Sequence, residues 1–277
     1  MPEGPELAKQ ADKINEWLDK CKTIIGINWD RKSRYATREK MKGINLVKLP
    51  LLVKNVYTRG KILIFTVTDL NEKTLYMVSH LGMSGYWSKD KNKYSNLYLK
   101  FGVTKDGYSK ELFRLYYDDM RRFGSFCIYE NLTEIFKKNG PCLMQAALHK
   151  YENKCCENKA TLEEWVKTLT NTKWKNKKIC EFMMEQKHFS SVGNYLRAEV
   201  LYRCKIHPEK LLSNLSKDEI NLLYFKTLKI MYKSYKNQLN LKCYAKSCDH
   251  LGNSVEKFTD SKKRTVHYVK NVQVKNL

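Results

Sequence analysis

The sequence predicts an α+β protein: an N-terminal β-sandwich with a helix packed on it, and a helical C-terminal part that ends in a β-hairpin. Three observations favour this fold. The chain has 277 residues, enough for one or two domains with a real core. Short apolar or alternating runs fill the first half, and helical periodicity replaces them after about residue 131. A Gly-Pro stop at 139–141 then predicts two domains, 1–138 and 139–277.

The N-terminal part should begin with a helix and continue in strands. Apolar residues recur on one helical face, so this helix is expected to pack on a sheet. They are Leu7, Ala11, Ile14, Leu18 and Cys21. Strand-like runs follow, separated by turn-forming segments such as "DLNEK" and "KDKNK". These runs are 23–29, 61–67, 74–87, 96–101, 112–117 and 124–129. Short strands at this spacing are typical of a sandwich or barrel.

The C-terminal part should be helical up to about residue 241. Helical periodicity marks 176–186, 194–204 and 216–235. Capping boxes mark two helix starts, Thr161 with Glu164 and Ser216 with Glu219. The period is then lost, and residues 255–273 indicate a hairpin with two β-rich arms around "DSKK".

The charge of the chain predicts a polyanionic partner. Lys and Arg number 52 and Asp and Glu 29, which gives a net charge of +23. An A+T-rich genome would explain Lys in place of Arg, but not the shortage of acids. No apolar run is long enough to span a bilayer, and no signal peptide opens the chain. The nine cysteines, odd in number, are therefore expected as reduced thiols in an intracellular compartment: cytosol, nucleus or viral factory.

One helix start and two loop tips are candidate nucleic-acid contacts. Gly193 and Asn194 precede a helix, so Asn194 is expected as an N-cap beside N–H groups that suit phosphate. An ordinary helical hairpin is the alternative. The stretches "HLGMSGYW" and "YDDMRRFGSF" place Met83, Arg121 and Phe123 at loop tips, where they could fill the gap left by a flipped base. The alternative is that the two apolar residues belong to the core.

Taken in order, these motifs resemble the Fpg/Nei family of DNA glycosylases. The motifs are "PEGPE", "RGK", "SHLGMSG", "MRRFG" and "VGNYLRAEVLYRCKIHP", followed by a basic C-terminal hairpin. The resemblance covers nearly the whole chain. The form "GNYLRAE" is closest to the endonuclease VIII-like branch, and the Lys- and Asn-rich composition is typical of a giant-virus (mimivirus) member.

The resemblance implies a bifunctional DNA glycosylase and AP lyase that uses no cofactor. After removal of Met1, Pro2 would carry an N-terminal amine with a reference pKa of ~7.7–8.0, well below that of lysine. Its iminium cannot lose an N–H proton, which makes it a strong electron sink for β,δ-elimination. Glu3 would protonate the opening sugar oxygen and shuttle protons. On the opening "MPEGPE" alone, an ordinary N-terminus is the simpler interpretation.

The resemblance also implies which residues contact damaged DNA. Lys61 would contact phosphate near the lesion and assist catalysis, and Arg264 would hold the phosphates flanking the flipped nucleotide. His80, Lys187 and Asn194 match further DNA-binding positions. The void-filling positions are Met83, Arg121 and Phe123, and the supporting ones are Glu6 and Arg122.

The tail departs from the family's zinc finger. Val269 and Val272 stand where the second cysteine pair is expected, and four residues rather than two separate Cys243 from Cys248. A conceivable alternative metal site is Cys243, Cys248, His250 and His267. We expect instead no metal and a zincless finger over about residues 242–277, whose paired strands hold the arginine of the hairpin.

The short connection "KNQLNLKCYAK" before the finger argues for oxidised pyrimidines and ring-opened purines over 8-oxoguanine as substrates. Two alternatives stay open: an Fpg-type 8-oxoguanine enzyme, and a non-catalytic, structure-specific DNA-binding protein. Intact Pro2, Glu3 and Lys61 argue against the second. The expected partner is damaged double-stranded DNA, with single-stranded DNA also open, bound by a monomer without a membrane partner.

Overall fold

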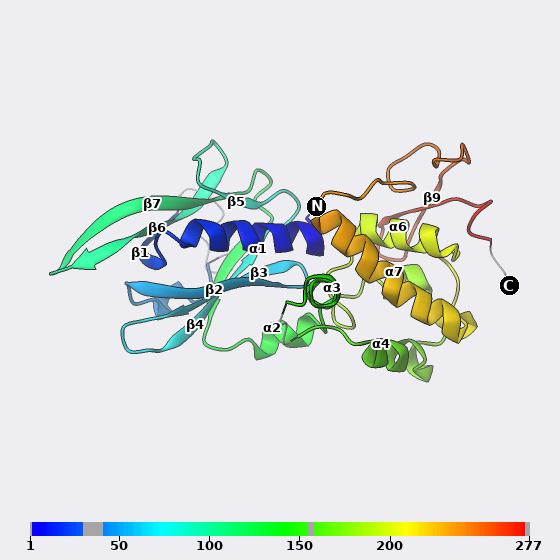
Figure 1. Ribbon diagram of the computed structural model, residues 1–277, viewed down its shortest axis with the longest axis horizontal. Coiled ribbons are helices and arrows are strands. Elements are labelled where there is room, and N and C mark those ends of the chain that lie inside the picture. The colour runs from blue at the N-terminus through cyan, green and yellow to red at the C-terminus, as the bar shows by residue number, and fades with distance from the viewer. Residues whose placement is uncertain (1, 30–40, 155–157, 275–277) are drawn as a thin grey trace. The chain divides into compact units, whose positions relative to one another are not determined.

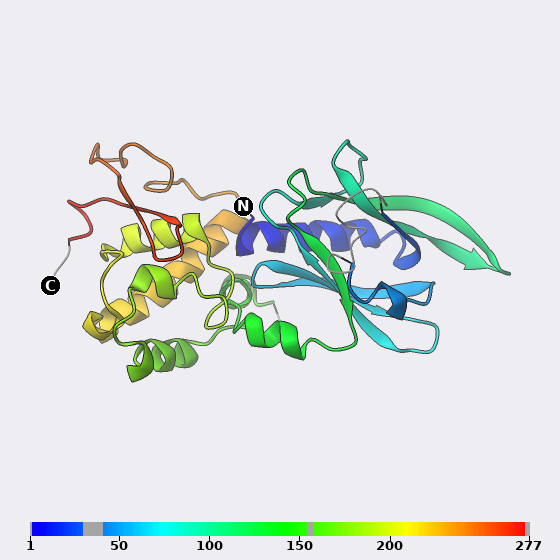
Figure 2. The ribbon, with the colours of Figure 1, turned by 180° about the vertical axis from the view of Figure 1, so that it is seen from behind.

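The computed structural model describes residues 2–29, 41–154 and 158–274 (Figure 1, and from behind in Figure 2). The chain divides into two compact units. Glu6–Ile135 belong to the first unit together with Pro2, and Phe136–Leu277 to the second. The second unit also includes Glu3–Pro5, from the other end of the chain. Among the described residues, no helix has the length and apolar character needed to cross a bilayer.

The described residues of the first unit form eight strands and α1, whose first two residues, Gly4 and Pro5, belong to the second unit. The helices are α1 Gly4–Leu18 and the 3-10 helix η2 Ile44–Leu46. The strands are β1 Thr23–Trp29, β2 Leu51–Arg59, β3 Ile62–Thr68, β4 Thr74–His80, β5 Tyr86–Ser88, β6 Ser95–Lys105, β7 Tyr108–Asp118 and β8 Ser125–Tyr129. The apolar face expected on α1 lies in the core, as Leu7, Ala11, Ile14 and Leu18 are all buried there.

The eight strands form one antiparallel sheet in the order β5-β7-β6-β1-β2-β3-β4-β8. Trp87 of β5 and Phe126 of β8 come from opposite ends of this order, yet their rings lie 5.6 Å apart. Phe65 of β3 packs edge-on against both rings. The sheet therefore folds over on itself, and the predicted β-sandwich is confirmed.

The second unit is mainly helical. Its helices are α2 Thr133–Lys138, α3 Leu143–Glu152, α4 Leu162–Leu169, η3 Thr172–Trp174, α5 Ile179–Phe182, α6 Asn194–Cys204, η4 Leu212–Asn214 and α7 Lys217–Tyr235. Both predicted capping boxes are present, at the starts of α4 and α7. The first residues of α2 lie before the unit boundary, but Phe136 and the rest of the chain belong here.

The tail forms the predicted hairpin. Strands β9 Glu256–Thr259 and β10 Thr265–Tyr268 pair in antiparallel register, with Thr259 opposite Thr265. Beside them is a small apolar cluster in which Val272 packs at the edge. Its buried members are Tyr202, Cys243, Val255 and Val269. Val269 and Val272, which stand where the resemblance implies cysteines, thus contribute apolar packing to the finger.

Candidate active site

Glu3 caps helix α6 from the far end of the chain. Its side chain is buried, with 2% of the residue exposed. One carboxylate oxygen accepts the backbone N–H groups of Gly193, at 2.8 Å, and Leu196, at 3.3 Å. The other accepts the N–H of Tyr195 at 3.0 Å. Three donors at a helix N-terminus stabilise negative charge on the Glu3 side chain.

The expectation that Asn194 is the N-cap of this helix is wrong. The N-cap is Gly193, which has no side-chain cap, and Asn194 is the first helical residue. The carboxylate of Glu3 already takes the amide hydrogens that a capping side chain would bind. The Asn194 side-chain oxygen instead accepts a hydrogen bond from Arg197 at 3.3 Å.

The glycines of this region are explained by close packing around Glu3. A Cβ on Gly193 would lie 2.2 Å from the Glu3 carboxyl carbon. A Cβ on Gly4 would lie 2.6 Å from that of Ser191, whose carbonyl accepts the Gly4 N–H at 3.0 Å. Glu3 is therefore fixed by Gly193 packed against its side chain and by the bond that holds Gly4, the next residue. Half-buried Pro2 directly precedes Glu3.

In the first unit, the "RGK" motif forms a tight turn. Arg59 pairs with Ile62, so Gly60 and Lys61 are the two loop residues of the β2–β3 hairpin. Gly60 has φ +63°, which a glycine adopts without strain and which two-residue hairpins require. Ile62 pairs in turn with His80, the exposed last residue of β4. The structure thus brings Lys61 and His80 to neighbouring positions at the same end of the sheet.

The loops that carry Met83 and Phe123 lie side by side. A Cβ on Gly82 would lie 2.8 Å from the backbone nitrogen of Gly124. Arg121 donates to the sulfur of Met83 at 3.5 Å. Met83 and Phe123 are 44% and 53% exposed, so the alternative that they are core residues is wrong.

One tyrosine fastens both loops. The Tyr117 hydroxyl donates to the carbonyl of His80 at 2.7 Å. Any Cβ on Gly85 would come within 2.7 Å of this hydroxyl, and one on Gly124 closer still. The Gly124 N–H also donates to Asp119 at 2.7 Å. Gly85 and Gly124 therefore make room for a phenol that packs at the bases of the two loops.

The supporting residues differ in their surroundings. Arg122 is exposed and has φ +55°, in the left-handed region, and its N–H donates to the Asp119 carbonyl at 3.2 Å. Glu6 lies in the first turn of α1 and is half-buried. Lys187, in the second unit, is exposed and its ammonium lies 5.4 Å from the centre of the Trp174 ring.

Asp260 positions Arg264 in the finger turn. Its carboxylate accepts the Arg264 side-chain Nε and the Arg264 backbone N–H, each at 2.9 Å. The same carboxylate pairs at 3.0 Å with Arg197 of α6, and both of these side chains are buried. Burial opposes ionisation of Asp260, but bonds from the Arg264 backbone and the Arg197 guanidinium outweigh it. The pKa of Asp260 is therefore lowered.

Glu199 makes a second link between α6 and the finger segment. Its buried carboxylate accepts the backbone N–H groups of Lys242, Cys243 and Tyr244, at 2.8 to 3.1 Å. Arg203 pairs with the same carboxylate. With Arg197, this makes two buried charged residues in the "NYLRAEV" helix that hold the tail.

Among residues 2–29, 41–154 and 158–274, no three His, Cys, Asp or Glu side chains gather in a way that could hold a metal ion. Burial raises the pKa of the Cys243 thiol to about 12. Cys248 is exposed. His250 contacts the Tyr202 hydroxyl and the Lys242 ammonium.

Sequence reasoning missed Arg197, Glu199 and Asp260. The signal was present for the first two: charged residues on a helix whose neighbours at 196, 198, 200 and 201 are apolar. A helix that buries residues all round has little amphipathic period, so periodicity could not reveal their burial.

Comparisons with known proteins agree with this architecture. A family model described as "Formamidopyrimidine-DNA glycosylase N-terminal domain" matches residues 1–126. One described as "Formamidopyrimidine-DNA glycosylase H2TH domain" matches residues 154–242. The formamidopyrimidine-DNA glycosylase of Mycoplasma genitalium is 27% identical over 242 residues, 84% of this chain and 75% of that protein. The enzyme of the same name from Lactococcus lactis subsp. lactis is 28% identical over 250 residues, 85% of this chain and 79% of that protein.

Solved structures show the same fold. One is MutM in complex with DNA containing carbocyclic 8-oxo-G, with a TM-score of 0.77 and 23% identity. Another is the Lactococcus lactis formamidopyrimidine-DNA glycosylase bound non-covalently to DNA with an AP site, with a TM-score of 0.74 and 23% identity. Each alignment covers 99% of this chain and 100% of the other. With both family models matched in order on one chain, the protein belongs to the formamidopyrimidine-DNA glycosylase family.

Proposed function

We propose that this protein excises damaged bases from DNA and then cleaves the abasic site, with the amine of Pro2 as nucleophile. The observation that carries the proposal is the buried carboxylate of Glu3, held by three backbone donors in the position directly after Pro2. A fixed proton acceptor beside an N-terminal amine suits nucleophilic attack through that amine.

The proton balance follows from this arrangement. The neutral amine bonds to C1′ of the damaged nucleotide while the glycosidic bond breaks and the base leaves with the bonding electrons. Glu3 takes the proton that the new ammonium loses and passes it to the ring oxygen O4′, which opens the sugar. Loss of a proton from C2′ then passes its bonding electrons towards the resulting iminium, and the 3′ C–O bond breaks with the phosphate as leaving group in β-elimination. Loss of a second proton, from C4′, breaks the 5′ C–O bond in the same way in δ-elimination.

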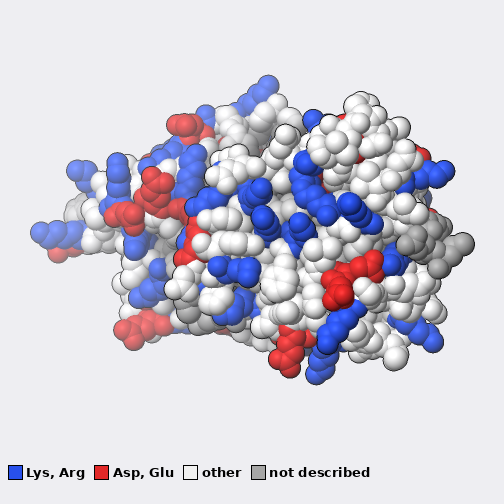
Figure 3. Space-filling view, turned by 45° about the vertical axis from the view of Figure 1, so that its right-hand side comes forward, with Lys and Arg blue, Asp and Glu red and all other residues white. Residues whose placement is uncertain are grey.

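The DNA-contacting residues are proposed in two groups. In the first unit, Lys61 and His80 lie at the same end of the sheet. Met83, Arg121 and Phe123 lie on two neighbouring loop tips. In the second unit, they are Lys187, Asn194 and the arginine at position 264. Lys and Arg side chains are spread over the face shown in Figure 3, in keeping with the net charge of +23. Such a surface suits the phosphate backbone of double-stranded DNA.

For substrates we propose oxidised pyrimidines and ring-opened purines, as in the endonuclease VIII-like branch. Helix α7 ends at Tyr235, and Glu199 fastens the segment that follows at the backbone N–H groups of Lys242, Cys243 and Tyr244. A segment tied down in this way has little freedom to fold over a flipped purine. We also propose that the finger needs no zinc, and that the enzyme acts as a monomer wherever the genome resides.

A second candidate is an Fpg-type enzyme for oxidised purines, which the names of the relatives favour. One similar solved structure is MutM bound to DNA with a carbocyclic 8-oxo-G, whereas a second is the Lactococcus lactis enzyme bound to DNA with an oxidised pyrimidine. The names therefore leave the lesion class of this chain to experiment.

The test is a panel of duplex oligonucleotides, each with one defined lesion, incubated with and without borohydride. We expect a covalent adduct mapped by peptide sequencing to Pro2, strongly reduced in Pro2→Gly. Preferred cleavage of oxidised pyrimidines supports the proposed branch, and preferred cleavage of 8-oxoguanine supports the second candidate. Trapping of equal yield through a lysine would overturn the mechanism.

A further inference from the structure

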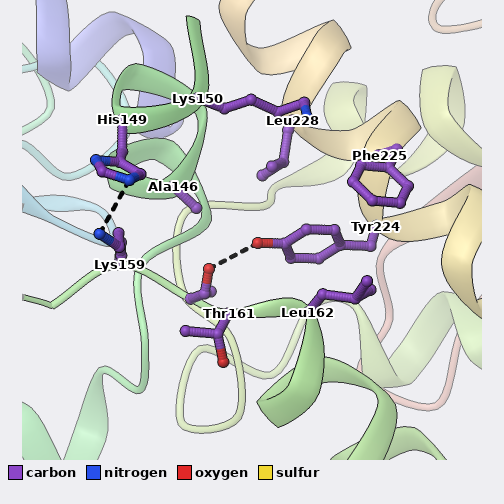
Figure 4. Close-up of a pocket in the computed structure, with 10 residues that line it drawn as sticks. Ala146, His149, Lys150, Lys159, Thr161, Leu162, Tyr224, Phe225 and Leu228 are labelled. Carbon is purple, nitrogen blue, oxygen red and sulfur yellow. Dashed lines mark hydrogen bonds between the residues drawn. The ribbon is translucent and has the colours of Figure 1, made fainter. Parts of the chain in front are cut away.

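The second unit has a cavity that the proposed chemistry does not use. It has a volume of about 470 Å³ and lies between α3, the segment before α4, and α7 (Figure 4). Tyr195, beside Asn194 at the start of α6, reaches α7 at Ser234, 2.9 Å between hydroxyls. Leu228, the last α7 residue of the cavity, lies nearly two turns earlier in that helix. The cavity is therefore separate from the capped end of α6.

The floor of the cavity is apolar and its rim is basic. Ala146, Leu162 and Leu228 supply aliphatic surface, and the Tyr224 hydroxyl is satisfied by the Ala160 carbonyl at 2.7 Å. The basic side chains at the rim are His149, Lys150 and Lys159. A ligand that fits this surface presents an apolar group to the floor and negative charge to the rim.

The rim lysines have no carboxylate partner among the described residues. No described carboxylate lies within ion-pair distance of Lys150 or Lys159, and the Lys159 ammonium lies 3.1 Å from a ring nitrogen of His149. Two described acids near the rim in the sequence have other partners. Glu164 is used in the capping box of α4, and Glu152 pairs with Lys154 and Lys236.

The shape of the cavity favours an inserted side chain over a stacked nucleobase. Phe225 is the exposed ring, at 42%, but the Lys150 ammonium lies over it, 5.0 Å from the ring centre. Tyr224 is buried. Single-stranded nucleic acids bind on open aromatic faces along a basic groove. Here the Lys150 ammonium occupies a face of the exposed ring, and Phe225 borders a hollow whose floor is aliphatic.

We propose that this cavity binds a partner protein through a short acidic segment that inserts one large apolar side chain. Phe225 and the aliphatic floor would surround the inserted side chain, as a buried anchor is surrounded in a protein interface. Lys150 and Lys159 would pair with acidic residues on either side of it, which sets the orientation and speeds association. The site goes beyond base excision, since it lies outside the residues proposed for that reaction.

The test uses a fluorescein-labelled synthetic peptide in which one phenylalanine is flanked by aspartates and glutamates. Fluorescence anisotropy is measured with the full-length protein at moderate salt. We expect saturable micromolar binding, weakened about tenfold by Lys150→Glu, by Phe225→Ala, or by replacing the peptide's phenylalanine with alanine. Matched controls on α7, the helix of Phe225, are Lys233→Glu and Leu222→Ala. They change exposed residues outside the cavity and should leave binding unchanged.

Two readouts separate this proposal from the proposed function. Excision of a damaged base by Lys150→Glu and Phe225→Ala should equal that of the unchanged protein, and circular dichroism should show that both variants fold. The proposal is overturned if the peptide shows no saturable binding at millimolar concentration, or if the control variants weaken it as much as the cavity variants. It is also overturned if a single-stranded oligonucleotide displaces the peptide and loses affinity in the same two cavity variants.

Discussion

The carboxylate of Glu3 lies 2.8 Å from the backbone nitrogen of Gly193, although 190 residues separate them in the chain. This contact joins the N-terminal "PEG" to the helix that opens with "NYLRAE". The second unit thus contains the residue that follows the proposed nucleophile, and the stability of α6 depends on a side chain from the start of the chain.

Glu3→Gln should affect stability and chemistry together. A glutamine offers one acceptor oxygen where the helix end needs two, so one of the buried N–H groups loses its partner, at a cost of about 1–3 kcal/mol in unfolding free energy. Excision of a damaged base should fall far more than cleavage of an abasic site, because an abasic sugar already opens without a proton donor. Denaturant unfolding and the two cleavage assays measure this. Glu16→Gln, on the exposed face of α1, is the control.

Gly193→Ala should reduce excision through Glu3 alone. The backbone at Gly193, with φ −128° and ψ −161°, accepts any residue. The added methyl would lie 2.2 Å from the Glu3 carboxyl carbon, so it acts only by displacing that carboxyl group. The double variant with Glu3→Gln should then lose little more activity than either single variant, because both changes remove one interaction. Losses that multiply would show that Gly193 acts through something else.

Acid should loosen the finger turn. The pKa of Asp260 is lowered in the folded protein, so its stabilising effect is present above the unfolded value of about 3.9 and is lost as pH falls through the lower folded value. Amide hydrogen exchange of residues 256–268 should therefore accelerate below about pH 4. At pH 7, Asp260→Asn should already show fast exchange, because Arg197 is left buried without its charge partner, at roughly 3 kcal/mol.

Cys243→Val should leave the finger folded and the enzyme active. The thiol packs with Val255 and Val269 in an apolar cluster, where a valine fits the surroundings as well. Replacement of a zinc ligand would instead unfold the finger. Elemental analysis, and excision assays with and without a chelator, complete the test. One equivalent of zinc that is lost together with activity would contradict the zincless interpretation.

Binding to duplex DNA should depend steeply on salt. Each proposed phosphate contact adds about 0.9 to the slope of log affinity against log salt, so Lys61→Ala, Lys187→Ala and Arg264→Ala should each flatten it by about that amount. Lys105→Ala is the control, since Lys105 ends β6 at the β6–β7 turn, and β7 separates that turn from the tip carrying Phe123 by about 33 Å. A slope unchanged in all three variants would contradict the electrostatic model.

Local signals were enough to predict α6, α7 and the start of α4, but not α3 at Leu143–Glu152. The limits of α6 agree with the predicted 194–204, and both capping boxes mark true helix starts, because their information lies within a few residues. Residues 176–186 have helical periodicity but form helix only at Ile179–Phe182. The N–H groups of Ile179 and Cys180 are instead used by the carbonyls of Lys210 and Pro208.

Features that depend on distant partners could not be predicted in this way. Strand β2 was missed because a register shift between Val53 and Asn55 interrupts its alternation. The cap of α6 was assigned to Asn194 because nothing near it in the sequence shows that Glu3 occupies the helix end. The motif residues were found through family resemblance, whereas the carboxylates that position them, such as Asp260, carry no local pattern.

The phenol of Tyr117, set between Gly85 and Gly124, has a mechanical consequence. Because one rigid side chain packs at both loop bases, we expect the tips carrying Met83 and Phe123 to move together. In the proposed function they would act as a single two-pronged probe whose spacing is set before contact. Search along undamaged DNA would then need one concerted insertion and withdrawal at each step, and the ordering of two separate loops would not have to be repeated at every base pair.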